Sequence, residues 1–99
     1  MIYAQKIYQF VSLIPAGKVV TYGQVAKSLK IGSARLVGQA LHRNTDPENI
    51  PCHRVVFSNG ALAKKYAFGG EKNQRKKLIR EGISFIKNKV DLKKHSLRF

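Results

Sequence analysis

The chain has 99 residues, the size of a single domain, and 43% of them are hydrophobic, too many for a disordered protein. Nineteen Lys and Arg against five Asp and Glu give a formal net charge of +14, so we expect a polyanionic partner, with nucleic acid favoured over an anionic membrane surface. No apolar run approaches the roughly 20 residues of a membrane span, one cysteine cannot form an internal disulfide, and the three histidines lack zinc-ligand spacing.

Four helices are predicted from apolar residues at helical spacing and from capping residues. They cover residues 3–14, 22–29, 34–43 and 71–81. Thr21 and Ser33 are typical N-caps of the second and third helices, and Gly32 supplies the turn between them. Glu71 lies in the first turn of the fourth helix, and Gly82 follows its end.

The second and third helices form the pattern of a helix-turn-helix motif, in which the second of the two helices enters a DNA groove. The polar side chains of that helix lie on one side: Arg35, Gln39, His42 and Arg43. Two capped helices around a glycine also occur in folds that never touch DNA. The charge of +14 favours the DNA-binding interpretation.

Two short β-hairpins are predicted in the second half of the chain. Residues 55–62 are expected to form one, with its turn at Asn59 and Gly60, and a second is expected around Asn88. Residues 86–99 are expected to form a basic tail that frays. The fold class is therefore mainly α with small β-hairpins, similar to a winged helix.

The only cysteine, Cys52, lies in the stretch "IPCHRVV". A thiol is a nucleophile only as the thiolate, so a neighbouring group must lower its pKa or accept its proton. His53 and Arg54 are adjacent candidates, and Glu81 is a carboxylate that could complete a relay. On composition alone a single intracellular cysteine is more often a small buried hydrophobe, and His53 and Glu81 have structural interpretations as well.

Five motifs together resemble one protein family. They are "IPAGKVVTYGQVA", "ARLVGQALHRN", "IPCHRVVFSNGAL", "YAFGG" and "REG", in the family's order and with nearly its spacing, over residues 1 to about 86. The family is the O6-alkylguanine-DNA alkyltransferases, or methylated-DNA–protein-cysteine methyltransferases. The resemblance implies a protein that binds double-stranded DNA in the minor groove, turns O6-alkylguanine out of the stack and moves the alkyl group irreversibly to its own cysteine, without a cofactor.

The resemblance also implies roles for individual residues. Cys52 is the alkyl acceptor, activated through water by His53, which Glu81 orients, and Tyr66 polarises the departing oxygen. The implied DNA-binding residues are Tyr22, which helps to rotate the nucleotide, Arg35, which fills the gap left by the flipped base, and Gly38 and Gln39. The implied supporting residues are Asn44, Pro51 and Arg54, and those of the base pocket are Val55, Gly69 and Gly70, with the carbonyls of Cys52 and Val55 reading the guanine amino group.

Simpler roles remain open for several of these residues. Arg35 is one of nineteen cations and could be a phosphate contact, Tyr22 could be a core aromatic, and the glycines could serve turns or packing. The chain also departs from the family pattern. Thr45 follows the asparagine where proline is common, and two lysines, Lys64 and Lys65, lengthen the loop before Tyr66.

The chain begins where the family's C-terminal domain begins, so we expect one domain over residues 1–99 and no N-terminal domain. That size is also typical of alkyltransferase-like proteins, which bind alkylated guanine and flag it for excision, but which have tryptophan or alanine in place of the cysteine. Cys52 favours transfer. A winged-helix regulator with an incidental thiol is the third hypothesis. We expect a monomer, cytoplasmic or nuclear, without a metal or a membrane partner.

Overall fold

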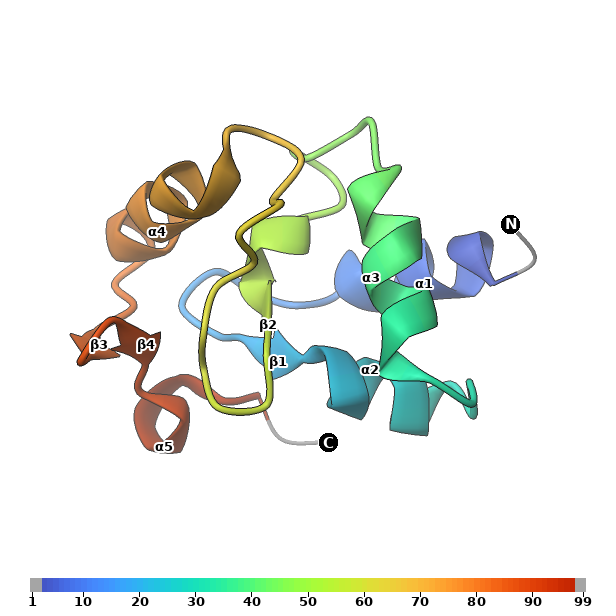
Figure 1. The fold of residues 1–99 in the computed structure, drawn as a ribbon, viewed down its shortest axis with the longest axis horizontal. Helices are drawn as coiled ribbons and strands as arrows, with labels where there is room; N and C mark the ends of the chain where they lie inside the picture. The colour runs from blue at the N-terminus through green and yellow to red at the C-terminus, as the bar shows by residue number, and fades with distance from the viewer. Residues whose placement is uncertain (1–2, 98–99) are drawn as a thin grey trace.

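A computed structural model describes residues 3–97 and shows a mainly helical domain with two small pairs of strands. In chain order its elements are α1 (Ala4–Val11), β1 (Val20–Thr21), α2 (Tyr22–Ser28), α3 (Ala34–His42), the 3₁₀ helix η1 (Cys52–Arg54), β2 (Val55–Val56), α4 (Gly70–Arg80), β3 (Phe85–Ile86), β4 (Lys89–Val90) and α5 (Leu92–His95). Figure 1 shows α1 to α3 at one end of the molecule, α4, α5 and the β3–β4 pair at the other, and β1 and β2 between them.

The four predicted helices are confirmed, and the two predicted N-caps fix α2 and α3. The Thr21 side chain accepts a hydrogen bond from the Gln24 N–H at 3.1 Å, and the Gln24 side chain accepts one from the Thr21 N–H at 2.8 Å. This reciprocal capping box satisfies two backbone donors that the helix leaves free. Ser33 caps α3 by accepting from the Arg35 N–H at 3.1 Å.

The turn between α2 and α3 differs from the prediction. Lys30, not Gly32, has the left-handed conformation, with a φ of 57°. The Ile31 N–H donates to the Ala26 carbonyl, which closes the end of α2, and a left-handed residue after a helix is the usual way to satisfy such carbonyls. The turn of the helix-turn-helix therefore has a lysine, not a glycine, at its left-handed position.

The hairpin predicted over residues 55–62 is wrong. The turn is present, since the Gly60 N–H donates to the Phe57 carbonyl, but β2 pairs in parallel with β1, with Val20 opposite Val55. The Phe57 N–H also donates to the Ala61 carbonyl at 3.0 Å, but no return strand follows, because the Val55 carbonyl and the Ala63 N–H both bond to the Gln74 side chain. The Gly60 carbonyl accepts from the Val90 N–H at 2.9 Å. The segment after β2 is therefore a loop tied to β4.

The second hairpin is confirmed, and the frayed tail is wrong for the residues that the structure describes. β3 pairs antiparallel with β4 across Lys87 and Asn88, whose φ values of 51° and 67° suit a tight hairpin turn. Beyond it, α5 forms and His95 is buried. The Val19 N–H donates to the His95 carbonyl at 3.0 Å, which anchors this segment beside β1. Residues 98–99 lie outside the described part.

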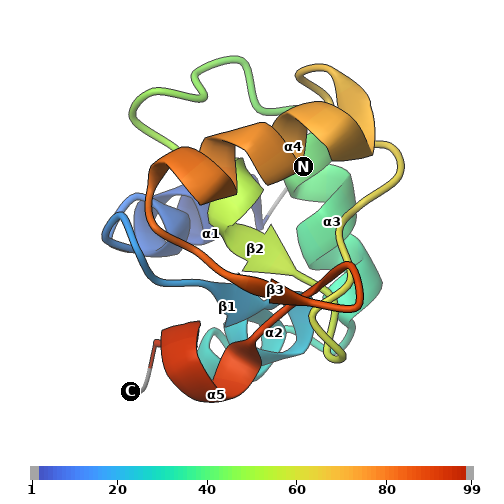
Figure 2. The same cartoon turned by 90° about the vertical axis from the view of Figure 1, so that its left-hand side faces the viewer.

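Two hydrophobic clusters hold the fold together. The larger one joins α1, α2 and α3 to η1 and includes Ile7, Val37 and Cys52. The smaller one joins α4 to β2 and the C-terminal hairpin and includes Leu78 and Val90. Figure 2 shows α4 lying across one side of β2, with α5 beyond β1 on the other side. Within residues 3–97, none of the helices has both the length and the apolar character needed to cross a membrane.

Candidate functional site

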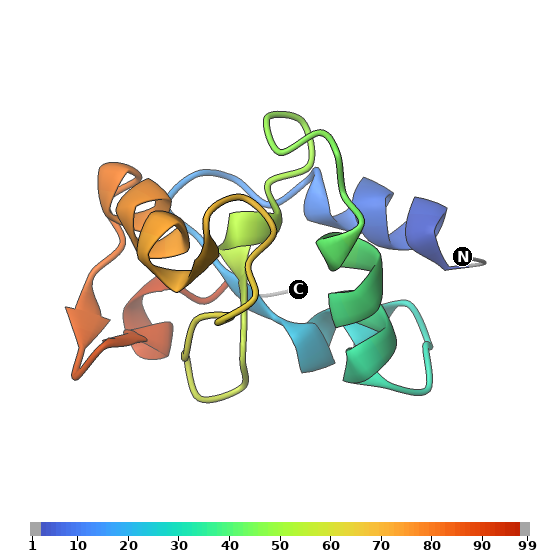
Figure 3. The same cartoon turned by 45° about the horizontal axis from the view of Figure 1, so that its top comes forward.

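Cys52 begins η1 and lies in the wall of an open cavity. Cys52 is 4% exposed. The cavity has a volume of about 1140 Å³ and is bounded by α3 on one side and by the loop over residues 57–69 on the other. Figure 3 shows that loop between α4 and α3. The thiol is therefore buried against the protein but accessible to a molecule that enters the cavity.

Asn44 holds the chain that leads to Cys52. Its Nδ2 donates to the Ile50 carbonyl at 2.9 Å, and its Oδ1 accepts from the Asp46 N–H at 2.9 Å. The side chain is buried and also hydrogen-bonds the Cys52 thiol. One amide therefore fixes the end of α3, the loop after it and the sulfur relative to one another.

His53, Arg54 and Glu81 form one hydrogen-bonded cluster. His53 Nε2 lies 3.0 Å from Glu81 Oε2, and Arg54 donates to both carboxylate oxygens, at 2.9 Å from Nε and 2.6 Å from Nη2. Arg54 Nη1 also donates to the Ile14 carbonyl at 2.6 Å. Burial by itself would raise the pKa of Glu81, but the hydrogen bonds from Arg54 and His53 prevail and hold that pKa below its ordinary value.

The ring of His53 is neutral and has one free nitrogen. Burial lowers the pKa of His53 below its ordinary value, and the contact with Glu81 opposes this only in part. Because a carboxylate can only accept, the proton of the neutral ring lies on Nε2. Nδ1 is then an acceptor, and it is buried without a hydrogen-bond partner among residues 3–97. The cluster thus presents a base whose tautomer is fixed by Glu81.

Opposing effects act on the Cys52 thiol. Burial raises its pKa, while the hydrogen bond from Asn44, the charge of Lys77 and the hydrogen bond from Tyr66 lower it, and burial prevails. Burial and the adjacent Cys52 also raise the pKa of the Tyr66 phenol. Tyr66 is therefore protonated at neutral pH and can donate a hydrogen bond to a thiolate or to an oxygen bound beside it.

Gln74 connects the site to α4 and to the loop. It is fully buried, and its Nε2 donates to the carbonyls of His53 at 3.1 Å and Val55 at 3.2 Å. Its Oε1 accepts from the Ala63 N–H at 3.0 Å. A buried amide with all these partners positions η1 and the loop together.

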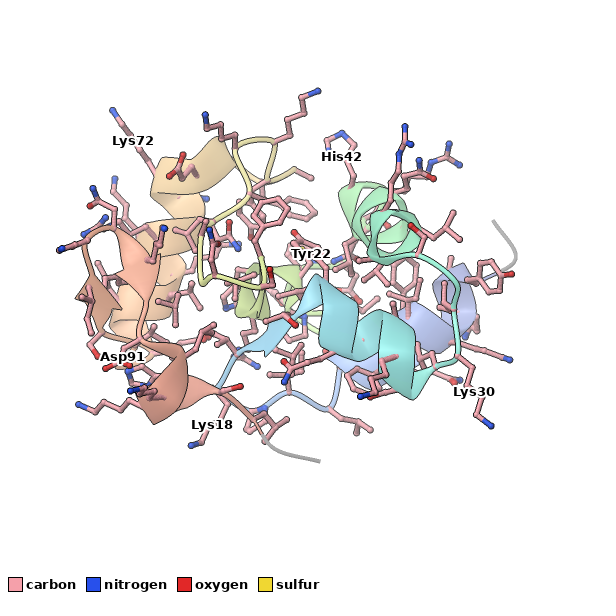
Figure 4. The ribbon with its side chains drawn as sticks, turned by 60° about the horizontal axis from the view of Figure 1, so that its bottom comes forward. Lys18, Tyr22, Lys30, His42, Lys72 and Asp91 are labelled. Carbon is pink, nitrogen blue, oxygen red and sulfur yellow. The ribbon has the colours of Figure 1, made fainter. Side chains whose placement is uncertain are left out.

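The other walls of the cavity come from α2 and α3. Tyr22 packs against Phe57 with ring centroids 5.2 Å apart, and burial followed by the Cys52 charge raises the pKa of Tyr22 to about 12. Arg35, Gly38 and Gln39 contribute one face of α3. Figure 4 shows Tyr22 near the centre of the molecule and His42 beside the loop, where His42 Nδ1 donates to the Lys65 carbonyl at 3.1 Å.

Residues 3–83 match the family model for the DNA-binding domain of 6-O-methylguanine DNA methyltransferase. The chain belongs to this family. Among its members, the methylated-DNA–protein-cysteine methyltransferase of Methanocaldococcus jannaschii is 43% identical over 93 residues, which cover 89% of the chain and 52% of that protein. The chain thus spans about half the length of that methyltransferase.

Two further alkyltransferase comparisons involve a shorter protein from Schizosaccharomyces pombe. Alkyltransferase-like protein 1 is 37% identical over 86 residues, which cover 86% of the chain and 80% of that protein. The structure of S. pombe Atl1 in complex with damaged DNA containing O6-carboxymethylguanine superimposes with a TM-score of 0.86 at 32% identity, over 98% of the chain and 95% of that structure. These similarities bear out the alkyltransferase fold.

Most residues to which the alkyltransferase resemblance gave roles meet at one place. Six of them line the cavity: Cys52, Tyr66, Tyr22, and Arg35, Gly38 and Gln39 of α3. Behind Cys52 lie the residues of the hydrogen-bonded cluster and of the support: Asn44, Pro51, His53, Arg54 and Glu81.

Three residues assigned to the base pocket lie elsewhere in the alkyltransferase domain. Gly69 and Gly70, with φ values of 108° and 75°, form the start of α4, and neither lines the cavity. A Cβ on Gly69 would lie 2.8 Å from that of Asn73, so the close approach that requires glycine is to α4. Val55 is buried in β2, and its carbonyl accepts from Gln74. Their contact with a base stays a prediction.

The sequence interpretation missed Gln74, Lys77 and Phe57. Gln74 and Lys77 share one face of α4 with Glu81, because positions three, four and seven residues apart lie together on a helix. That spacing was the available signal once Glu81 had been assigned to the site. Within residues 3–97 no group of three or more His, Cys, Asp or Glu side chains could hold a metal ion.

Proposed function

We propose that this chain binds double-stranded DNA containing O6-alkylguanine and transfers the alkyl group, once and irreversibly, to Cys52. The observation that carries the proposal is the position of the buried thiol in the cavity wall, hydrogen-bonded by a protonated Tyr66 and followed in η1 by a neutral histidine that Glu81 holds. An ether oxygen is a poor leaving group, so the reaction needs a base for the thiol and a donor for the oxygen. His53 is the proposed base, and Tyr66 is the proposed donor.

The proposed reaction begins with proton transfer from the thiol. His53 Nδ1, which has no protein partner in the described chain, takes the Cys52 proton through a bridging water, and the imidazolium is stabilised by Glu81. The sulfur electron pair then forms a bond to the alkyl carbon, and the C–O6 bond breaks with its electron pair on O6. Tyr66 donates its proton to the guanine and receives a proton from the His53 imidazolium. The net result is that the proton of the thiol is transferred to the guanine. The product is a thioether that no residue can remove.

DNA binding is proposed to use α3 and the positive charge. Arg35 and Gln39 are exposed on α3 at the cavity, where the nucleotide would enter, and Ser33 caps the helix that presents them. Within residues 3–97 the ion pair between charged groups joins Arg54 to Glu81, and Lys77 and Arg75 donate to Tyr66 and Asn88. Most of the other cations can therefore neutralise phosphates. The S. pombe Atl1 complex with damaged DNA supports the same use of this fold.

Lesion binding without transfer is the second candidate function. It is favoured by the likeness to S. pombe Atl1, which extends over nearly all of both chains. The two candidate functions differ at one residue, since alkyltransferase-like proteins lack the cysteine that this chain has at position 52. A measurement on the sulfur therefore separates them.

Intact-mass spectrometry after incubation with a duplex containing O6-methylguanine tests the proposal. We expect one methyl group per chain, mapped to Cys52 and absent from Cys52→Ala, with an undamaged duplex as the control substrate. Tight binding to the lesion without a mass change would instead establish the second candidate. Preference for one undamaged DNA sequence, with neither lesion binding nor a mass change, would make the protein a regulator.

A further inference from the structure

Lys77 of α4 reaches the site through Tyr66. Its Nζ donates to the Tyr66 hydroxyl oxygen at 2.8 Å and lies 5.3 Å from the centroid of the Tyr66 ring and 5.5 Å from that of Phe68. The Lys77 side chain is half-buried, whereas Lys72 and Lys76 on the same helix are exposed. One ammonium group is therefore held against two aromatic rings, one of which contacts the thiol.

The direction of this hydrogen bond determines what the phenol can do. A phenol has one proton, and its oxygen also accepts. Because Lys77 donates to that oxygen, the phenol proton is left for another acceptor, and Tyr66 hydrogen-bonds Cys52. Hydrogen bonds in series polarise one another, so the ammonium makes Tyr66 a stronger donor to sulfur.

Among residues 3–97, Lys77 is the cation that donates to the Tyr66 hydroxyl. Charged and titratable groups surround Cys52 from several elements: Tyr22 from α2, Arg35, His42 and Arg43 from α3 and its end, His53 and Arg54 from η1, Lys64, Lys65 and Tyr66 from the loop, and Lys77 and Glu81 from α4. Arg54 is paired with Glu81, and His53 is neutral. Among the described residues, Lys77 is the cation whose charge lowers the pKa of the Cys52 thiol, and no carboxylate neutralises it.

We propose that Lys77 is a positioning residue of this site, which holds the Tyr66 hydroxyl toward Cys52 and stabilises the thiolate. None of the family motifs in the sequence assigned Lys77 a role. The effect on alkyl transfer rests on the proposed function, because it requires that the thiolate be the reactive form. The effect on the thiolate itself requires neither DNA nor an alkylated base.

The rate of Cys52 alkylation by iodoacetamide, followed by intact mass from pH 6 to pH 10, tests the proposal. Removing a unit charge near the sulfur raises the thiol pKa, and we expect Lys77→Met to react about tenfold more slowly at pH 7. Lys77→Arg should restore most of the rate, and Lys77→Gln should not. Lys76→Met, which removes the same charge from an exposed position one residue away, is the matched control.

Three outcomes would overturn the assignment. The first is an unchanged pH profile in folded Lys77→Met and Lys77→Gln, with folding checked by circular dichroism. The second is an equal change in Lys76→Met, which would mean that the overall positive field acts on the thiol. The third is an undiminished Lys77→Met effect in a Tyr66→Phe background, which would exclude the phenol as the link.

The same variants separate this proposal from the proposed function. If no variant, nor the parent chain, accepts a methyl group from O6-methylguanine DNA, the proposed function fails, and the iodoacetamide profiles still decide the role of Lys77. If the parent chain accepts the methyl group and Lys77→Met does so at the same rate and with the same thiol profile, only the role of Lys77 fails.

Discussion

Replacing Glu81 with glutamine should destabilise the fold in a pH-dependent manner. The carboxylate accepts from His53 at 3.0 Å and twice from Arg54, and its side chain is 17% exposed. Glutamine keeps one acceptor and turns an NH₂ group toward a donor. Hydrogen bonds to charged groups contribute about 1.5–3 kcal/mol each when buried, and solvent screening reduces this sum, so we expect a loss of about 2–3 kcal/mol at pH 7.

The sign of the pH dependence follows from the lowered pKa of Glu81. A carboxyl group with a lower pKa in the folded state stabilises the fold fully above its unfolded pKa of about 4.3. That stabilisation is lost as the pH falls through the folded pKa. The difference in unfolding free energy between the parent chain and Glu81→Gln should therefore be large at pH 7 and should decrease steadily as the pH falls below about 4.3.

Urea unfolding followed by circular dichroism, at pH 7 and at a series of lower pH values, measures this difference. At pH 7 the thermal midpoint should also fall by about 10–15 °C, since about 1 kcal/mol corresponds to 4–8 °C in a domain of this size. Glu71→Gln is the control, because Glu71 is exposed in the first turn of α4 and its charge contributes below about 1 kcal/mol. Equal losses in the two variants, or a difference that does not decrease as the pH falls, would refute the reasoning.

Two other predictions concern the loop and α3. Gly60→Ala should lower the unfolding free energy by about 2–4 kcal/mol in urea, because Gly60 has a φ of 87° and a Cβ would lie 2.6 Å from the Val90 carbonyl oxygen. Gly32→Ala, which meets open space, should be nearly neutral, and similar costs at both positions would contradict this explanation. Arg35→Ala should slow methyl transfer from a duplex at least tenfold more than demethylation of free O6-methylguanine. Equal losses on both substrates would exclude a role for Arg35 in base extrusion.

The helices of this fold were predictable because their signals are local. Thr21 and Ser33 act within three residues of themselves, and the apolar spacing of α1 and α3 is visible in short windows. The pairing of β1 with β2 was not predictable in this way, since strands of two residues joined in parallel depend on contacts 35 positions apart. The turn at Gly60 was a correct local signal, but the strand expected after it does not form, because the distant Gln74 side chain bonds the Val55 carbonyl and the Ala63 N–H.

The candidate site was also predictable only in part. The resemblance assigned Cys52, His53 and Glu81 to one site, and the structure places His53 Nε2 3.0 Å from Glu81 Oε2. The sequence did not indicate a role for Lys77, because composition does not distinguish a lysine that packs against aromatic rings from the other eighteen Lys and Arg residues. The basic composition of the C-terminal segment predicts fraying. Two of its residues are buried nevertheless: Val90 is apolar, and the His95 ring accepts a hydrogen bond from the Ser84 N–H.

The division of the core into two clusters has a consequence for the protein's cooperative units. Cys52 belongs to the larger cluster with the helix-turn-helix, whereas Glu81 follows a helix that is anchored by Leu78 in the smaller one. A local opening confined to the smaller cluster would remove Glu81 from His53 and leave α2 and α3 folded. Binding and chemistry would then have separate local stabilities, and amide hydrogen exchange in α4 and α3 would report each of them in the same molecule.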